Sequence, residues 1–397
     1  MTSAHEAATS EPFAVTASVR AVGRSGAARA RRGMRLTALG AFGFVAVLLA
    51  GCAKDAPQNT FNPEGPEAET INNLAVPVFI IAGVVGVIVI AVVGIIIWRF
   101  AAKRHAADEV PTQIHGNSKL EIAWTILPGV LLLPIAVFTV ATVFDLAETP
   151  DDALVVDVIG QQWWWEFGYP DQGIVTANEI VIPTGQPVQV RISSRDVIHS
   201  FWIPALNGKR DAVPGRVTSI TLEADNPGEY WGQCTEFCGL SHANMRIRAV
   251  ALSPDDFDAW VANQQNDAAT PDEGTPAAAG LEVFTNRGCA ACHAVRGLDD
   301  PVDVPLVAGA APNLTHLMTR TTFAGAALEL ITADCDVPPP GPTGTPVECL
   351  DRSNLEAWLR DPEALVPMAP DEGRGMPTLG LTEAEIDSLV DYLSTLS

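Results

Sequence analysis

The sequence predicts a multidomain membrane protein that consists of a transmembrane hairpin, a β domain and a third domain ending in a helix. Two apolar runs predict helices at about residues 74–98 and 121–146, which form the hairpin of residues 74–146. From residue 151 onward apolar and polar residues alternate, which indicates a β domain at residues 147–261. The remainder, residues 281–397, forms the third domain.

Composition limits the classes of partner. A length of 397 residues suggests two or three domains. Lys and Arg number 24 against 47 Asp and Glu, and the net charge of −23 argues against nucleic acid as a partner. The acidic excess is compatible with a basic protein partner and equally with a solvated surface.

Residues 1–51 are typical of a secretory leader with an N-terminal extension, whose true start is either Met1 or Met34. An arginine-rich stretch precedes the apolar run at residues 36–50, and small residues follow it, as in secretory signals. The sequence Leu-Ala-Gly-Cys that ends at Cys52 resembles a bacterial lipobox, which implies lipidation of Cys52. The alternative is an uncleaved anchor helix, and either interpretation predicts that the segment after Cys52 is exported.

Polar residues at 52–73 form a linker, and the hairpin comes next. Leu74–Trp98 contains no charge in 25 residues and would span about 37 Å as a helix, enough to cross a bilayer. The second run contains Pro128 and Pro134, which transmembrane helices tolerate.

The distribution of basic residues orients the hairpin. Lys and Arg occur between the two runs, at Arg99–Lys119, and the next basic residue after the second run is Arg191. The positive-inside rule therefore places the connecting loop in the cytoplasm and both later domains on the extracytoplasmic side of a bacterial cell membrane.

In the β domain, Val188, Val190 and Ile192 alternate with polar residues, and the run Thr218–Leu222 behaves in the same way. Clusters of Pro, Gly, Asn and Asp bound these runs. Short alternating strands with such spacing predict a β-sandwich or barrel whose loops can hold metal ligands.

One stretch of this domain concentrates metal-binding side chains. It runs from Cys234 to Met245 and contains two Cys, one His and one Met, while His199 lies upstream. Thiolate, thioether and imidazole ligands together favour copper. Two thiolates suit a pair of coppers bridged by both sulfurs, with one His for each metal. The alternatives are a Cys2His2 zinc site, which leaves Met245 without a role, and a disulfide between Cys234 and Cys238.

Residues 262–280 lack an apolar face and predict a mobile linker. The sequence Cys289-Ala-Ala-Cys292-His293 comes after it, and Cys-x-x-Cys-His is typical of covalent haem c attachment with His293 as an iron ligand. A thiol redox motif is the alternative, but it requires a βαβ context, which is absent from this pattern.

A second iron ligand is expected from a distant segment. Met376 lies in a Met-Pro loop before a predicted helix at 383–396, and Met368 and Met318 are the competing candidates. A Pro- and Gly-rich insert carries Cys335 and Cys349, which we expect to pair in an oxidising compartment. Closing a loop of about 15 residues stabilises a domain by up to ~3 kcal/mol in the chain-entropy model.

Across about residues 70–255 the chain resembles subunit II of haem–copper cytochrome c oxidases. Three segments carry the resemblance: the Cys234–Met245 stretch, Gly160-Gln-Gln-Trp-Trp-Trp165, and Leu120-Glu-Ile-Ala-Trp-Thr-Ile-Leu-Pro128. The resemblance implies a cupredoxin-like Greek-key domain and a binuclear copper centre (CuA). The implied copper ligands are His199, Cys234, Glu236, Cys238, His242 and Met245, with Glu236 binding through its backbone carbonyl.

The same resemblance implies three further roles. The Glu236 side chain would point toward a magnesium ion shared with subunit I. Trp163 would be the point at which electrons enter, although three tryptophans also suit a core or an interface. Glu121 would lie at the mouth of a proton pathway, although a carboxylate in a first helical turn is also ordinary. The related quinol oxidase subunits lack the copper cysteines, which favours a cytochrome c route.

Residues 280–397 resemble class I cytochromes c fused to some bacterial subunits II, which implies an all-α domain with Met376 as the sixth iron ligand. Together the resemblances imply the electron-receiving subunit of a proton-pumping cytochrome c oxidase. Its partners would be subunits I and III, and its donor cytochrome c or a quinol:cytochrome c reductase complex. The alternatives are a membrane-tethered carrier without an oxidase partner and a copper-delivery assembly protein.

Overall fold

The computed structural model describes residues 56–101, 113, 115–298, 311–335 and 346–397. The predicted leader and Cys52 lie outside these ranges, as does most of the loop predicted to be cytoplasmic. The helices and strands of these ranges belong to one compact unit, Pro57–Ser397.

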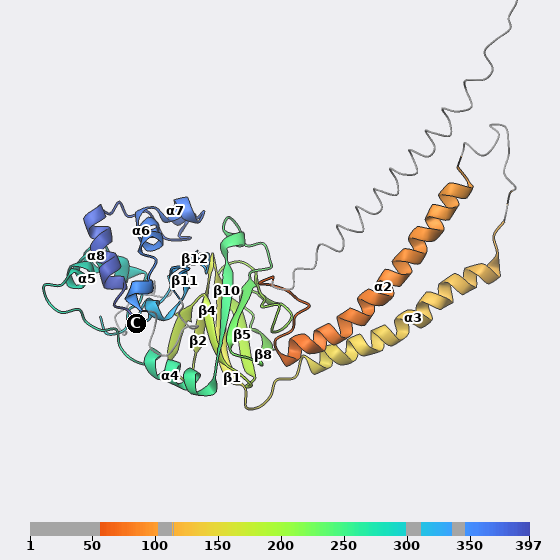
Figure 1. The fold of residues 1–397 in the computed structure, drawn as a ribbon, viewed down its shortest axis with the longest axis horizontal. Helices are drawn as coiled ribbons and strands as arrows, with labels where there is room; N and C mark the ends of the chain where they lie inside the picture. The colour runs from red at the N-terminus through yellow and green to blue at the C-terminus, as the bar shows by residue number, and fades with distance from the viewer. Residues whose placement is uncertain (1–55, 102–112, 114, 299–310, 336–345) are drawn as a thin grey trace, which may run out of the picture. The chain divides into compact units, whose positions relative to one another are not determined.

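Two long helices form the predicted hairpin (Figure 1): α2 at Pro66–Arg99 and α3 at Ser118–Asp145. Both helices are long and apolar enough to cross a membrane. The rest of the chain does not bury the most apolar stretch of either helix. α2 begins at Pro66 and not at Leu74, because a proline at the first position and acidic residues in the first turn favour a helix start even where the sequence is polar. The Asn117 side chain caps α3 by accepting a hydrogen bond from the Leu120 N–H at 3.2 Å.

The predicted polar linker makes specific contacts before α2. The Glu64 N–H donates to the Ala205 carbonyl at 2.8 Å, and the Glu64 carbonyl accepts from the Asp225 N–H at 2.9 Å. Gly65 lies so close to the Glu223 carbonyl that a side chain there would collide with it. The membrane hairpin is therefore joined to the β domain by paired backbone groups.

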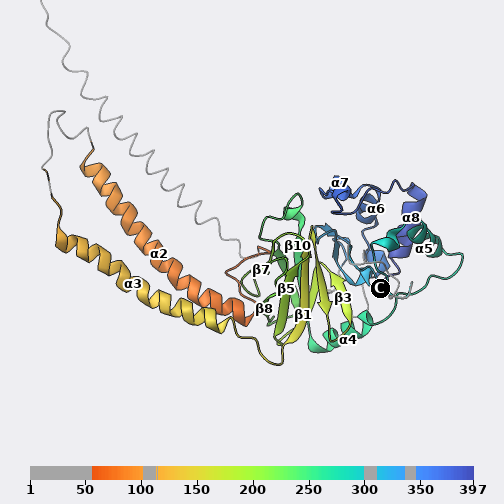
Figure 2. The ribbon, with the colours of Figure 1, turned by 180° about the vertical axis from the view of Figure 1, so that it is seen from behind.

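The β domain is a two-layer, cupredoxin-like structure (Figures 1 and 2). The larger sheet has the order β3-β2-β1-β5-β8 and the smaller has the order β4-β10-β9, with β1 parallel to β5 and β4 parallel to β10. The short strands β6 and β7 pair with each other, and helix α4 follows β10. The strand bounds are β1 Leu154–Gln161, β2 Trp164–Tyr169, β3 Ile174–Ala177, β4 Glu179–Pro183, β5 Val188–Ser194, β6 His199–Phe201, β7 Arg210–Ala212, β8 Thr218–Leu222, β9 Gly228–Gln233 and β10 Arg246–Leu252, and α4 is Pro254–Gln264.

The predicted alternation is confirmed in β5, where Val188, Val190 and Ile192 are buried between half-exposed neighbours. Tyr169 ties the two sheets together, because its hydroxyl accepts from the Val181 N–H and donates to the Val181 carbonyl, both at 2.8 Å. Its ring also packs edge-on against Trp260 of α4 at 5.3 Å. These contacts hold the scaffold from which the metal-binding loops extend.

The C-terminal domain, residues 276–397, has only a modest helical content and is not the all-α domain that the sequence predicts. Its helices are α5 Pro276–Asn286, α6 Arg352–Arg360, α7 Pro362–Leu365 and α8 Glu383–Leu393. It also contains 3-10 turns and a hairpin of two very short strands, β11 Thr322–Phe323 and β12 Leu328–Glu329. Strands this short leave no alternating pattern, so the sequence did not indicate the hairpin.

Helices α5 and α8 pack closely. Gly280 lies against the Ser388 carbonyl, leaving no room for a side chain, and the Phe284 and Tyr392 rings meet edge-on at 5.5 Å. A capping box of Thr382 and Glu385 begins α8. The segment between α4 and α5 that has no helix is therefore residues 265–275, shorter than the predicted linker.

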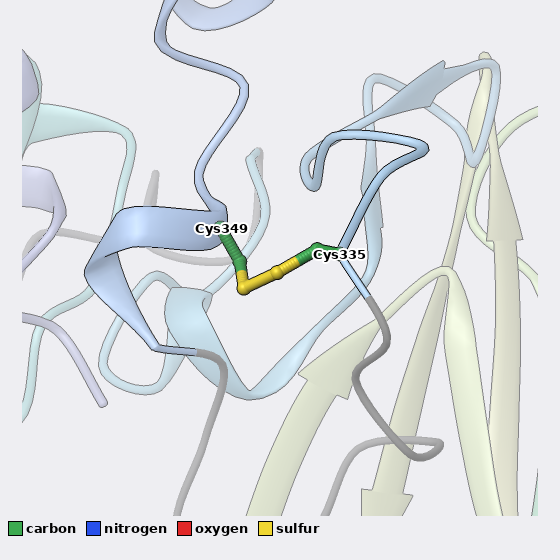
Figure 3. Close-up of a disulfide and its surroundings, with 2 residues drawn as sticks. All are labelled: Cys335 and Cys349. Carbon is green, nitrogen blue, oxygen red and sulfur yellow. A yellow bond between two sulfur atoms is a disulfide. The ribbon is translucent and has the colours of Figure 1, made fainter.

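The insert carries the expected disulfide, which joins Cys335 to Cys349 with their Cα atoms 5.5 Å apart. Figure 3 shows that the bridge connects the segment after β12 to a short 3-10 helix, Val347–Cys349. It encloses residues 336–345, which lie outside the described ranges.

We predict that Gly280→Val destabilises the α5–α8 contact by about 1–3 kcal/mol, because overpacking a tight site forces backbone movement. Amide hydrogen exchange of α8 measures the effect. Glu282→Val is the matched control, since it places the same side chain at an exposed position of α5. Equal exchange in the two variants would contradict this account of the packing.

Candidate metal centre

Five donor side chains converge at one end of the β domain. The ligand loop, Cys234–Met245, connects β9 to β10, and His199 begins β6. The two thiol sulfurs lie 3.8 Å apart, and each is close to an imidazole Nδ1: Cys234 to His199 at 3.9 Å and Cys238 to His242 at 3.5 Å. The Met245 sulfur lies 3.8 Å from Cys238.

The backbone supplies a sixth donor. The Glu236 carbonyl oxygen lies 3.2 Å from the Cys234 sulfur, while the Glu236 side chain is exposed. The six residues that the family resemblance implies as copper ligands therefore lie close together. His199, Cys234 and Cys238 alone form a buried group whose ligand atoms lie within 4.8 Å of one another.

Both cysteines of the loop are free thiols. A sulfur separation of 3.8 Å is far from the ~2.05 Å of a disulfide, so the structure contradicts the disulfide alternative for this pair. The hydrogen bond from Cys238 lowers the pKa of Cys234 to about 4, whereas the same contact and burial raise the pKa of Cys238. Both sulfurs can ionise together only if a positive charge lies near them, and a bound metal ion would provide that charge.

Asp196 orients His199. Its Oδ1 accepts from His199 Nε2 at 2.8 Å, which leaves Nδ1 facing the thiols. Burial alone would lower the pKa of His199, but the bonds to Asp196 and Cys234 outweigh it and raise that pKa. Asp196 is itself held by the N–H groups of Gln162 and Val197, both at 2.7 Å. A carboxylate behind a ligating imidazole is a common means of fixing the ring.

Trp163 is joined to the ligand loop. Its indole Nε1 donates to the Cys238 carbonyl at 2.9 Å, and Gln162 Nε2 donates to the same oxygen at 2.6 Å. The Trp163 side chain is 7% exposed, whereas Trp165 is fully buried in the β-domain core. Of the tryptophan run, Trp163 is therefore the residue bonded to the metal loop.

The Cys-x-x-Cys-His segment lies in the C-terminal domain. Cys289 begins a 3-10 helix that ends at Ala291, and both Cys289 and Cys292 are free thiols. His293 Nδ1 donates to the Pro312 carbonyl at 2.8 Å, so Nε2 is left for a metal. Burial lowers the pKa of His293, which keeps the imidazole neutral and able to ligate.

The three methionine candidates lie in different surroundings. Met376 packs on the core of the C-terminal domain, as does Cys289, and Met318 is fully buried within that core. Met368 instead packs against the core of the β domain. Of these three, only Met376 is both partly accessible and packed on the same core as Cys289.

The remaining candidate residues lie elsewhere. Glu121 is in the first turn of α3, where its carboxylate accepts from the Asn117 N–H at 3.3 Å, an ordinary capping contact. His316 is buried, with its ring nitrogens 3.0 Å from the Ser397 carbonyl and 3.1 Å from the Asn266 carbonyl.

Two residues near the ligand loop were not predicted from the sequence. Asp196 stands three residues before His199, and an acid so close to a candidate ligand is a usable signal. Gly160 lies against the His199 ring, and a Cβ there would be 2.9 Å from the His199 Cδ2 atom. Nothing in the sequence indicates that close approach, because it depends on how β1 and β6 are folded together.

Comparisons with known proteins agree with this geometry. The family model described as "Cytochrome C oxidase subunit II, transmembrane domain" matches residues 58–142, and "Cytochrome C oxidase subunit II, periplasmic domain" matches residues 172–252. The chain is 35% identical over 360 residues to cytochrome c oxidase subunit 2 of Alkalihalophilus pseudofirmus, covering 89% of this chain and 95% of that protein. Against the same subunit of Bacillus sp. (strain PS3), identity is 36% over 372 residues, covering 89% and 96%.

A quinol oxidase subunit 2 of Bacillus cereus is also similar, with 30% identity over 227 residues that cover 56% of this chain and 77% of that protein. The matches over 89% of the chain extend well beyond residue 252, where the second family model ends. The C-terminal domain is therefore largely included in the similarity to the two cytochrome c oxidase subunits.

We predict that Gly160→Ala lowers copper affinity by on the order of 10–100-fold, because the new Cβ displaces the His199 ring. Gly168→Ala is the control, since its Cβ would meet only the Asp157 Cβ at an ordinary 3.7 Å. Competition with a copper chelator measures both affinities. Equal affinities would show that His199 tolerates movement or is not a ligand.

Proposed function

This chain belongs to the cytochrome c oxidase subunit II family, and we propose that it carries electrons through a haem c and a binuclear copper centre to subunit I of a proton-pumping terminal oxidase. In subunit I, dioxygen would be reduced to water. The observation that carries the proposal is the convergence of two buried thiols, two imidazoles and one thioether in a space too small for separate functions.

The donor set fits two coppers and the chain's residues determine how they would be held. Cys234 and Cys238 would hold the coppers through two thiolates, His199 and His242 through one nitrogen each, and Met245 and the Glu236 carbonyl as weak donors. A bound copper pair would supply a one-electron carrier. The role of Asp196 is to keep the His199 ring fixed, and burial excludes water from both sulfurs.

The C-terminal residues fit a covalent haem c. Cys289 and Cys292 are available for thioether bonds, and His293 presents Nε2. Nearby, Arg320 is buried, and its Nε has no hydrogen-bond partner among the described residues. Burial lowers the pKa of Arg320 to about 10, although Glu179 acts in the opposite direction, and a haem propionate would supply a further negative charge beside this guanidinium. His293 and Met376 would hold the haem iron.

We propose that the route between the two sites passes through Trp163. Trp163 is bonded to the Cys238 carbonyl, and the C-terminal domain contacts the same ligand loop where Ser241 Oγ donates to the Pro367 carbonyl. We infer that Trp163 receives electrons from the haem and passes them to the copper pair. The direct donor to the haem would be cytochrome c or a quinol:cytochrome c reductase complex.

The other side of the ligand loop suits subunit I. Phe237 is 77% exposed and Leu240 65% exposed, so an apolar surface is left open beside the thiols. We propose that subunit I covers it, with subunit III also in the complex, and that the exposed Glu236 side chain shares a magnesium ion with subunit I. Glu121 is proposed to lie at the cytoplasmic mouth of a proton pathway.

The membrane hairpin favours an oxidase subunit over the two alternatives. A tethered carrier needs only one helix, or a lipid such as Cys52 would carry if lipidated, whereas the described residues form two apolar helices. A copper-delivery protein has no use for a covalent haem. Both the β and the C-terminal domain are proposed to lie on the extracytoplasmic side of a bacterial membrane.

The proposal is tested on the full chain, purified with its membrane partners. We expect two coppers and one haem per chain, and an electron paramagnetic resonance spectrum in which one electron is shared by two copper nuclei. A large polytopic subunit should co-purify. One copper or one zinc per chain would overturn the relay, and a chain free of partners would favour the tethered carrier.

The axial ligand is tested by substitution. Met376→Ala should abolish the sulfur-to-iron absorption band and lower the haem reduction potential, because the thioether stabilises ferrous iron. Met368→Ala is the matched control and should leave both unchanged. Loss of the band in Met368→Ala instead would reassign the ligand.

A further inference from the structure

The side chain of Ser241, in the ligand loop, is directed to another part of the chain. Ser241 is 0% exposed and precedes a 3-10 turn, His242–Asn244. A serine at such a position ordinarily accepts hydrogen bonds from the backbone N–H groups of its own turn. Within the described residues the Ser241 hydroxyl forms no such capping bond, and its Oγ donates instead to the Pro367 carbonyl of the C-terminal domain.

Ser241 stands between two of the proposed copper ligands. Cys238 precedes it by three residues and His242 follows it directly. The Cys238 sulfur and His242 Nδ1 lie 3.5 Å apart, and the Asn244 side-chain amide donates to the Ser241 hydroxyl at 3.4 Å. A metal held by Cys238 and His242 would therefore fix the short stretch of backbone that carries Ser241.

The acceptor of this hydrogen bond begins the segment that ends at the proposed iron ligand. This methionine segment is Pro367–Met376, and it is closed by a pair of backbone hydrogen bonds. The Ala369 N–H donates to the Arg374 carbonyl at 2.9 Å, and the Arg374 N–H donates to the Ala369 carbonyl at 3.1 Å. Met376 follows this closed loop after one residue, so the loop determines where its thioether lies.

Two further features stiffen the methionine segment. A Cβ on Gly375 would lie 2.6 Å from the Met368 Cβ, so the start and the end of the segment are packed together. Pro370 lies within the segment and Pro377 follows Met376, and each proline ring restricts φ. A displacement at one end of a stiff segment reaches its other end, because few bond rotations are left to absorb it.

We propose that Ser241 is a positioning residue that couples copper binding in the ligand loop to the bond between Met376 and the haem iron. The element with two states is the methionine segment, whose Met376 is either on the iron or displaced from it. A fixed Ser241 holds Pro367 and so favours the bound state. The coupling is reciprocal, as linkage requires of two binding free energies. It rests on the proposed function, because both metal groups belong to that function.

The coupling is tested on the full complex by titration with imidazole, which displaces a thioether from haem iron. The sulfur-to-iron absorption band reports the displacement. We expect removal of copper by a chelator to raise the imidazole affinity of the wild-type haem by about fivefold or more. An imidazole affinity that does not depend on copper would overturn the coupling.

Ser241→Ala removes the hydrogen bond to Pro367. In this variant the copper-loaded chain should already have the higher imidazole affinity, and removal of copper should change it by less than about twofold. Ser200→Ala is the matched control and should respond as the wild type does. Ser200 is also 0% exposed and adjoins the ligand His199, but its hydroxyl has no hydrogen-bond partner among the described residues. A wild-type response in Ser241→Ala would assign the coupling to another contact.

The reciprocal effect is tested with the ligand loop intact, which also serves if Ser241→Ala fails to fold or to load copper. Met376→Ala releases the methionine segment from the iron, so copper affinity should fall by the same factor of about five or more, measured by chelator competition. Unchanged copper affinity would contradict the proposal.

Failure of the coupling is distinguishable from failure of the proposed function. A chain without two coppers, or without the sulfur-to-iron band, refutes the function at the metal count or the spectrum. A chain that has both, but whose imidazole affinity ignores copper, refutes the coupling alone.

Discussion

Two thiols 3.8 Å apart in a buried loop are a strong constraint, because two thiolates so close repel each other unless cations lie between them. The surrounding structure serves to hold that arrangement. β9 and β10 fix the ends of the ligand loop, Asp196 fixes the His199 ring, and Gln162 and Trp163 hold the Cys238 carbonyl. The result is a rigid, water-poor site, as electron transfer requires when geometry must change little between redox states.

A second constraint operates between the domains. Glu179 and Arg248 are buried in neighbouring strands, and both find partners on the hairpin of the C-terminal domain. Removing one partner from a buried charged group is costly, so such a contact favours one fixed arrangement over a swinging tether. The Ser241–Pro367 hydrogen bond adds a second point of contact at the ligand loop.

The local features were predictable and the long-range ones were not. Cys234–Met245 and Cys289–His293 are short motifs whose spacing predicts their chemistry, and the two membrane helices follow from uncharged runs. The hairpin that contacts Glu179 could not be predicted, because its strands have two residues each and its hydrogen-bond partners lie more than 140 residues away. The early start of α2 was missed because a proline at the first position and an acidic first turn, and not apolarity, decide it.

We propose that haem and copper exchange electrons within one chain, whose C-terminal domain is docked on the β domain. The most direct measurement is photochemical injection of an electron into the haem of the purified complex, followed by the absorbance of both centres. We expect the haem to reoxidise as the copper is reduced, in a first-order process whose rate is independent of protein concentration. A rate proportional to protein concentration, or a haem that stays reduced, would contradict this account.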